Sequence, residues 1–419
     1  MTECQKTPQL GGSSQALLWV VLLIGLAAHL PIVIPGTDNS NVGYYAVSVP
    51  FKISEIGFRV QLSAFDILLP FIVIWGWRRG WLAPPPPQVT IAVLAAVAAV
   101  IIHSIAYGLL NEQLLLARLV KESLKLIAIL LELLLLVALF GRSDDMAPPF
   151  KIVLTILIVS CIIFSASSAV ISITQYEPII LTRTIYATYL AGLIFLLIFN
   201  EQWRSQPHSR VYLIGACLAV IATSILLQSK TTAGLVTAIL TWVIFDKFIP
   251  ADKLPRISFI AAVFLIVVGA ALTTSALLGA NVELLQHMDT FKRSIGIRLE
   301  LWSLAADQTI KSFPFGIGMG QFSSATKSVP LLAHEGHNFV HNSFLGLAVE
   351  LGFIGIVIGA GIIWVLFTAT RGFPLHSAPV YLIIVLPPLL IHDGHSIRIL
   401  LFITALGLAR YLQQQRTIS

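Results

Sequence analysis

Long apolar runs alternate with short polar segments along most of the chain. Each run has roughly 20 residues, which is enough for a helix to cross a bilayer, and the pattern predicts about 12 of them. They cover residues 16–34, 62–77, 88–109, 117–140, 151–173, 184–200, 211–228, 232–249, 257–279, 343–370, 377–392 and 396–413. We therefore expect one all-α polytopic membrane domain over residues 1–419, because helices satisfy their own backbone in lipid.

One long polar segment, residues 280–342, separates the ninth and tenth runs. Within residues 294–312, five apolar residues recur at helical spacing between polar ones, which predicts an amphipathic helix on the membrane or on the bundle. They are Ile295, Leu299, Trp302, Ala306 and Ile310. This helix should end before Pro314, and the three glycines of residues 316–320 permit a tight turn. Asn342 or Ser343 is placed to cap the tenth span.

Composition agrees with a membrane protein. Hydrophobic residues make up 57% of the chain and charged residues 11%, with a mean hydropathy of +0.89, whereas soluble domains carry about 25% charged residues. The net charge of +6 first reports topology rather than nucleic-acid binding. Cys161 and Cys217 lie inside apolar runs and Cys4 in a polar tail, so we expect no disulfide framework. The run at 16–34 lacks a cleavage site and should be the first span.

The basic residues orient the predicted spans. With the N-terminus in the cytoplasm, 13 of the 26 Lys and Arg residues fall in short cytoplasmic segments. These are Lys6, Arg78, Arg79, Arg142, Lys151, Arg204, Arg210, Lys247, Lys253, Arg256, Arg371, Arg410 and Arg416. This distribution satisfies the positive-inside rule. It places segment 280–342 outside, in the periplasm if the membrane is a bacterial inner membrane.

Three histidines stand near the end of the polar segment. His341 directly precedes the tenth span, where helix N–H groups and the dipole favour a neutral imidazole, as a general base requires. The alternative is a polar residue that only caps the helix. His334, His337 and His341 are three and four residues apart, so a metal site is a further alternative. Gly336 argues against a continuous helix there, and we expect no metal and no cofactor.

Basic residues on the outward side form a second group. Cations in or near a membrane are costly and usually face a cavity or a partner, and an anion would suit them. The group comprises Arg118, Lys121 and Lys125 on the fourth span, Arg183 at the start of the sixth, Lys230 in a short hairpin, and Arg293 and Arg298 in the polar segment. The alternative for each is snorkelling to lipid headgroups, and Glu122 could pair with Arg118.

Other charges and missing motifs narrow the function further. Glu132 lies deep in an apolar run and needs a partner or a proton. No Walker-type phosphate loop is present, and the glycines at 316–320 follow no predicted strand, so they do not indicate a dinucleotide site. No Asp-rich metal pair stands out on the outward side, which disfavours metal-dependent sugar transfer.

The polar segment resembles the O-antigen ligase and polymerase superfamily. The resemblance rests on His341-Asn342, nine further residues, and then Gly352-Phe-Ile-Gly355. Upstream, Arg298-x3-Trp302 and the stretch Pro314-Phe-Gly-Ile-Gly-Met-Gly-Gln-Phe322 are also similar to the family's pattern. Where family members often have a Ser-Arg pair at the outward hairpin, this chain has Ser229-Lys230, which keeps the charge but loses the bidentate fork.

This resemblance implies a C-type glycosyltransferase-like fold in the bacterial inner membrane, with its site facing the periplasm. It implies an inverting, metal-independent O-antigen ligase that moves a glycan from undecaprenyl diphosphate to a sugar hydroxyl of lipid A–core. His341 and Arg298 would be catalytic. The diphosphate or substrate would meet Arg183, Lys230, Arg293, His337, Asn342, Arg118 and Lys121. The alternatives are an O-antigen polymerase, which extends lipid-linked repeats, and a transporter of lipid-linked glycans.

Overall fold

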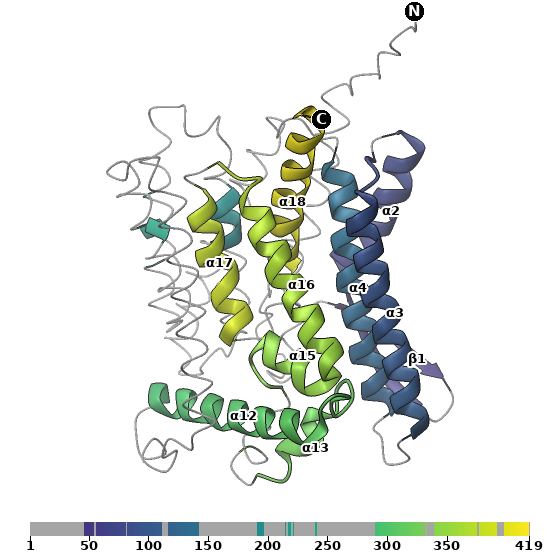
Figure 1. Cartoon of the computed structure of the whole chain (residues 1–419), viewed down its shortest axis with the longest axis vertical. Coiled ribbons are helices and arrows are strands. Elements are labelled where there is room, and N and C mark those ends of the chain that lie inside the picture. Colours follow the sequence, from purple (N-terminus) through teal and green to yellow (C-terminus); the bar gives the residue numbers. More distant parts are fainter. Residues whose placement is uncertain are drawn as a thin grey trace, which may run out of the picture.

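The computed structural model describes a helical bundle with one helix across its end (Figure 1). It describes residues 46–53, 56–80, 82–110, 116–141, 191–196, 214, 217–218, 221, 239–240, 290–329, 332, 339–374, 377–391 and 398–418. Its upright helices are α2 (Ala64–Arg78), α3 (Pro87–Leu110), α4 (Leu116–Phe140), α16 (Phe353–Thr370), α17 (Ala378–Ile391) and α18 (Arg398–Ile418). Its other helices are α12 (Thr290–Ser312), α13 (Phe322–Thr326) and α15 (Ser343–Leu351).

The apolar runs account for the upright helices. Three of them, in α3, α4 and α16, are long and apolar enough to cross a membrane, and α2 and α17 contain shorter apolar helices. Apart from α16, which begins ten residues after the start of the predicted span 343–370 (353 − 343), each lies within a few residues of a predicted span. The predicted spans at 16–34, 151–173 and 257–279 lie outside the described residues, as does most of 184–200, 211–228 and 232–249. The full count of about 12 therefore stays a prediction.

Two features differ from the expected all-α pattern. Strands β1 (Ala46–Ile53) and β2 (Ile56–Ser63) pair antiparallel, with Ala46 opposite Ser63 and Ile53 opposite Ile56. This hairpin leads directly into α2. In addition, the run 343–370 is not one span, because the chain breaks at Gly352 between α15 and α16.

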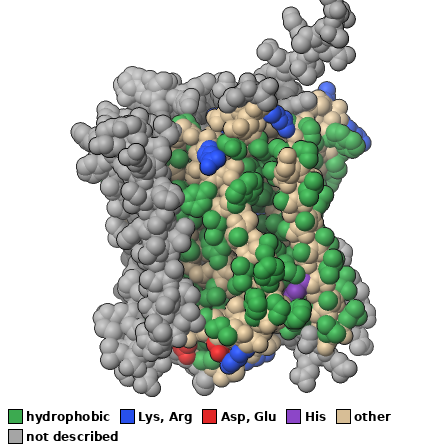
Figure 2. All heavy atoms as spheres, viewed as in Figure 1, with side chains coloured by type: hydrophobic (Ala, Val, Ile, Leu, Met, Phe, Trp, Pro, Cys, Tyr) green, Lys and Arg blue, Asp and Glu red, His purple; other side chains and the backbone are tan. Residues whose placement is uncertain are grey.

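The main core lies among α4, α16, α17 and α18. Fully buried aromatic side chains fill it, and Tyr381 on α17 forms a hydrogen bond with Thr404 on α18 at 3.0 Å between the hydroxyl oxygens. Figure 2 shows hydrophobic side chains over the middle of the visible face, with Lys and Arg side chains near both ends. An apolar middle between charged ends is the surface expected of a membrane protein.

The two ends of the bundle are distinct. α12 lies across one end, which we call the loop end, beside α13 and α15 (Figure 1). At the opposite end, the Arg416 guanidinium donates to the carbonyl of Pro84 at 2.7 Å, and Gln413 donates to the carbonyl of Phe140 at 3.1 Å. Arg371 lies over the ring of Tyr411 at the same end. The described residues thus place Arg371 and Arg416 at the end away from α12, and the orientation of the two ends in the membrane stays a prediction.

Candidate active site

His341 lies at the loop end, immediately before α15, in a left-handed backbone conformation with φ of 55°. Residues on either side hold it there. Val340 is buried, and the Asn342 side-chain oxygen accepts hydrogen bonds from the backbone N–H groups of Phe344 (3.1 Å) and Leu345 (3.0 Å). The predicted cap is therefore confirmed, with Asn342 as the capping residue. The His341 side chain is partly exposed, but its Nδ1 atom is buried.

The predicted amphipathic helix is confirmed as α12, and it packs on the bundle rather than standing apart. Ile297, Leu299 and Trp302 share a buried cluster with Val340, the residue before His341, and with Val349 on α15. Ile310 departs from the predicted apolar face, because 73% of its surface is exposed. The shared cluster fixes α12 against the His341 segment.

Arg298 lies on the part of α12 that makes this cluster, between two of its members. Its side chain is partly buried, and burial lowers the pKa of the Arg298 guanidinium. An arginine remains protonated at neutral pH even so, so the site holds a cation that is partly withdrawn from water. Arg293 lies on α12 as well. Its side chain is outside the described residues.

The glycine-rich turn interlocks with the end of α15. The backbone N–H of Ile317 donates to the Val349 carbonyl at 2.9 Å, Gly318 N–H to the Glu350 carbonyl at 3.0 Å, and Phe353 N–H to the Pro314 carbonyl at 2.8 Å. Gly352 has φ of 59°, and a Cβ atom there would lie 2.1 Å from the Pro314 oxygen. A side chain cannot fit at that distance, so the break in the predicted span 343–370 stands at a position that requires glycine.

Helices α3 and α4 hold this turn from the other side. His103 Nε2 lies 2.7 Å from the Phe315 carbonyl oxygen, which can only accept, so Nε2 carries the hydrogen. Gly318 faces the ring of Tyr107, where a Cβ atom would come within 2.5 Å of the ring. Arg118 donates to the Ser323 hydroxyl, and Ser323 in turn donates to the Gly320 carbonyl at 3.3 Å.

The first turns of α4 carry the predicted basic face. The expected pairing of Glu122 with Arg118 is not the one the structure shows, since Glu122 lies 3.6 Å from Lys125 and Arg118 bonds to Ser323. Glu122 and Lys125 are three residues apart, and residues three or four apart lie on the same face of a helix, so this pairing is as accessible as the expected one. Lys121 is partly exposed on the same helix.

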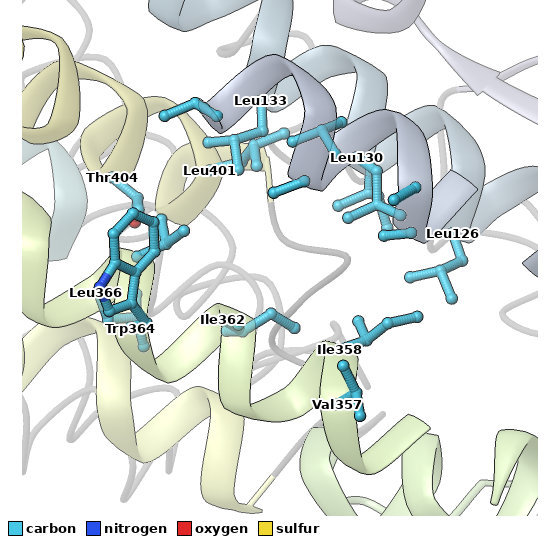
Figure 3. A pocket seen from close by; sticks show the side chains of 18 of the residues that line it. Leu126, Leu130, Leu133, Val357, Ile358, Ile362, Trp364, Leu366, Leu401 and Thr404 are labelled. Carbon is cyan, nitrogen blue, oxygen red and sulfur yellow. The ribbon is translucent and has the colours of Figure 1, made fainter. Parts of the chain in front are cut away.

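Two cavities adjoin this region. A small one of about 50 Å³ is lined by Glu122, Lys125, Leu126, Met319, Phe339, Val340, Gly346, Leu347 and Glu350. A groove of about 580 Å³ lies between α3, α4 and α16 and reaches α17 and α18. Figure 3 shows Leu126, Leu130 and Leu133 on its α4 side and Val357, Ile358 and Ile362 on its α16 side. Leu126 lines both spaces, so the apolar groove and the polar cavity lie next to each other at this side chain.

The groove wall is smooth and apolar. Ala92, Ala95, Ala96 and Ala99 line it from α3. On α16, a Cβ atom added at Gly361 would meet nothing within 4 Å. A space of this kind suits a long hydrocarbon chain better than a polar ligand.

Glu132 finds the partner that the sequence pattern did not name. Its carboxylate lies 3.0 Å from Nε of Arg398, and both side chains are buried. Arg398 is the first residue of α18 and a cation inside the predicted span 396–413. A cation inside an apolar span needs a partner of opposite charge, so the position of Arg398 in the sequence could have identified it as a candidate partner of Glu132.

Several predicted site residues lie outside the described part of the chain: Arg183, Lys230, His334 and His337. Among the residues that the structure does describe, no group of three or more His, Cys, Asp or Glu side chains could hold a metal ion. The site that remains visible combines His341, the Arg298 segment and the basic start of α4.

Much of this site lies in a segment that matches a known protein family. Residues 178–360 match the family described as O-antigen ligase. The matched segment, 183 of the 419 residues, is similar to the O-antigen ligase family. The family match contains α12, the glycine-rich turn, His341 and the Gly352 break. O-antigen ligases are glycosyltransferase-type enzymes of lipopolysaccharide biosynthesis, which is the class of activity that this similarity implies. The comparison with curated proteins gives no match.

Proposed function

We propose that the protein is an O-antigen ligase of the bacterial inner membrane, with its site facing the periplasm. It transfers a glycan from undecaprenyl diphosphate to a sugar hydroxyl of lipid A–core. The observation that supports this most directly is the fixed position of His341. Buried Val340 precedes it, the Asn342 cap follows it, and both lie within the family match. A pre-positioned base at a helix N-terminus suits deprotonation of a hydroxyl group.

The reaction is a single displacement. His341 takes the proton of the acceptor hydroxyl, whose oxygen forms a bond to the anomeric carbon of the donor glycan. The bond from that carbon to the diphosphate oxygen breaks, so undecaprenyl diphosphate leaves and the anomeric configuration inverts. Because Nδ1 of His341 is buried, Nε2 is the nitrogen that accepts the proton. No metal is required if cations stabilise the leaving diphosphate.

Arg298 supplies the first of these cations, and Arg293, Arg183 and Lys230 join it. A partly buried arginine has a stronger effect than an exposed one, since water screens it less. His337 and Asn342 lie next to the acceptor. Arg118 and Lys121 add positive charge where α4 begins, although the bond from Arg118 to Ser323 gives that residue a positioning role as well.

The apolar groove gives the donor lipid a place. A polyprenyl chain in the space between α3, α4 and α16 would reach Leu126, the side chain that also lines the small cavity. Its diphosphate would then lie near Lys125, one turn of α4 below Lys121. The donor would enter sideways from the bilayer, with its glycan at the loop end.

A transfer assay tests this proposal. Purified protein in proteoliposomes receives undecaprenyl-diphosphate glycan, lipid A–core and excess EDTA, and product is followed on gels. His341→Asn is the sharpest variant, because Asn tolerates a left-handed backbone but cannot act as a base. We expect its rate to fall by about 10²- to 10⁴-fold. Arg298→Gln should lose about 10²- to 10³-fold, while Lys311→Gln, an exposed cation on the same helix, should keep the wild-type rate.

The other outcomes separate the alternatives. A His341→Asn enzyme that transfers glycan at the wild-type rate would overturn the role of His341. Loss of activity in EDTA would return the three histidines to consideration as metal ligands. Lengthening of lipid-linked repeats without transfer to lipid A–core would indicate a polymerase. Export of labelled donor without any product would indicate a transporter.

A further inference from the structure

The turn that follows α12 combines exposed aromatic side chains with a fixed depth along the bundle. We propose that residues 310–320 enter the leaflet on the loop-end side of the membrane, where Ile310, Phe313 and Phe315 contact lipid acyl chains. The turn is then a re-entrant segment rather than a loop in water. This inference uses the helix lengths and contacts and does not rest on the proposed function.

The first measure of depth comes from α3. Its 24 residues span about 36 Å at 1.5 Å per residue, against about 30 Å for the hydrocarbon core of a bilayer. His103 lies seven residues before Leu110, the end of α3 (110 − 103), or about 10 Å inside that end. With α3 centred in the membrane, His103 is inside the hydrocarbon core. Its hydrogen bond to the Phe315 carbonyl holds Phe315 at the same depth.

The order of contacts shows how the turn descends and returns. Phe315 contacts His103, Gly318 faces Tyr107 one helical turn nearer the end of α3, and Gly320 packs against Arg118 at the start of α4. Successive residues of the turn therefore meet positions that lie progressively closer to the loop end. Phe315 is therefore the residue of the turn that lies farthest from the loop end and deepest in the membrane.

Helix α16 gives a second, independent measure. It has 18 residues, about 27 Å, which is shorter than the hydrocarbon core. Its far end is marked by Arg371, which lies over Tyr411 near the end of α18. If that end is at one surface, Phe353 at the other end falls inside the opposite leaflet. The bond from Phe353 N–H to the Pro314 carbonyl places the turn there as well.

Irregular backbone can lie in a membrane only when its polar groups are satisfied by protein. Several polar groups of this turn are paired in this way. Phe315 and Gly316 N–H donate to the Ser312 carbonyl, each at 3.0 Å, and Ile317 and Gly318 N–H donate to the end of α15. The carbonyls of Pro314 and Phe315 accept from Phe353 and His103. Such pairing is unnecessary for a loop in water and essential in lipid.

The exposed side chains continue a lipid-facing surface. Phe315 is 70% exposed and Phe313 is 56% exposed, next to Ile310. Ile102, Ile105 and Leu109 on α3, a helix long and apolar enough to span, are also exposed. Apolar side chains that extend a membrane-facing surface at the same depth fit acyl chains. The exposed Lys311 beside them suits the headgroup region.

Spin-label accessibility in proteoliposomes tests this inference. The native cysteines are replaced, and single cysteines are introduced as Phe313→Cys and Phe315→Cys in the full chain. Ile105→Cys reports a lipid-facing helix position, and Ser328→Cys reports an exposed position in the loop beyond α13. Collision with oxygen, which partitions into lipid, is compared with collision with a water-soluble nickel chelate.

We expect the oxygen-to-nickel ratio at residues 313 and 315 to match that at 105 and to exceed that at 328. A ratio at both positions equal to the one at 328 would overturn the inference. If Phe315→Cys does not fold, Ile310→Cys replaces it, since Ile310 is exposed on the regular helix and contributes no core packing. The measurement needs no substrate, so an inactive protein would leave it unaffected.

Discussion

Removing one member of the Glu132–Arg398 pair should destabilise the protein far more than removing both. The carboxylate oxygen and Nε are 3.0 Å apart, and the side chains are only 9% and 8% exposed. The pair joins α4 to α18, two helices of the main core. In Glu132→Leu, the Arg398 guanidinium stays buried and loses this carboxylate. In Arg398→Met, the Glu132 carboxylate is left in the same position.

The expected magnitude follows from that burial. Breaking a buried ion pair from one side costs about 3–5 kcal/mol, whereas replacing both partners with apolar residues is often neutral or stabilising. The double variant Glu132→Leu/Arg398→Met should therefore be close to the wild type. The Lys311–Asp307 pair is the control, because its atoms are closer, at 2.7 Å, but its side chains are 66% and 49% exposed. Asp307→Asn should cost only about 0.3–0.5 kcal/mol.

The assay is equilibrium unfolding in mixed micelles, repeated for the wild type, both single variants, the double variant and Asp307→Asn. The coupling energy is the sum of the two single effects minus the double effect, and we expect about 3 kcal/mol or more. The reasoning fails if Glu132→Leu costs no more than Asp307→Asn. It also fails if the double variant loses the sum of both single effects, since burial would then not decide the balance.

Three further predictions concern the groove, the glycine interlock and α12. The leucine side chain of Gly361→Leu would point into open groove space, so this variant should raise the KM for the lipid donor in the transfer assay without lowering the unfolding temperature. The control Ala360→Leu, at the adjacent exposed position, should change neither quantity. Equal KM values for the two variants would exclude donor binding in the groove. Gly352 has φ of 59° and ψ of −130°, a sparsely allowed conformation that costs a residue with a side chain about 1–3 kcal/mol. Gly352→Ala should lower the free energy of unfolding by more than this cost, because its Cβ would also lie 2.1 Å from the Pro314 oxygen. Gly361→Ala should be neutral or stabilising by up to about 1 kcal/mol, and equal losses would refute the steric argument. Burial raises the pKa of the Glu300 carboxyl, so this group binds its proton more tightly in the native state than in the unfolded chain, and stability is lost as pH rises through the native pKa. Glu300→Gln should therefore unfold at a higher temperature than the wild type at pH 8 and at the same temperature at pH 4. A difference in unfolding temperature that is constant across pH would contradict this.

The sequence pattern predicted the spanning helices well because their signal is local. Continuous apolar residues forced α3, α4 and α17 into helices within a few residues of the expected bounds. The Asn342 cap and the α12 helix were also local features, visible in a few neighbouring side chains. The approach of α12 to the His341 segment follows from its apolar face, which needs a partner.

What the pattern missed depends on contacts between distant residues. The run 343–370 has 28 residues, about 42 Å as one helix, and this excess over a bilayer was the available sign of a break at Gly352. Arg118 could pair with Glu122 on its own helix, but Ser323, 205 positions away, takes that place. The hairpin before α2 showed no distinct apolar pattern in the sequence. The partner of Glu132 could be identified only once the position of α18 beside α4 was known.

The interlock of the glycine-rich turn with the end of α15 has a consequence for recombination between related enzymes. Pro314 and Gly352 are in contact through backbone atoms, so the two stretches form one structural unit although they are 38 residues apart in the sequence (352 − 314). A chimera whose crossover falls between them would take the glycine-rich turn from one parent and the end of α15 from the other, and the two stretches would not be complementary. Crossovers before α12 or within α16 keep the unit whole. A chimera with a related protein should therefore fold only when both stretches come from the same parent.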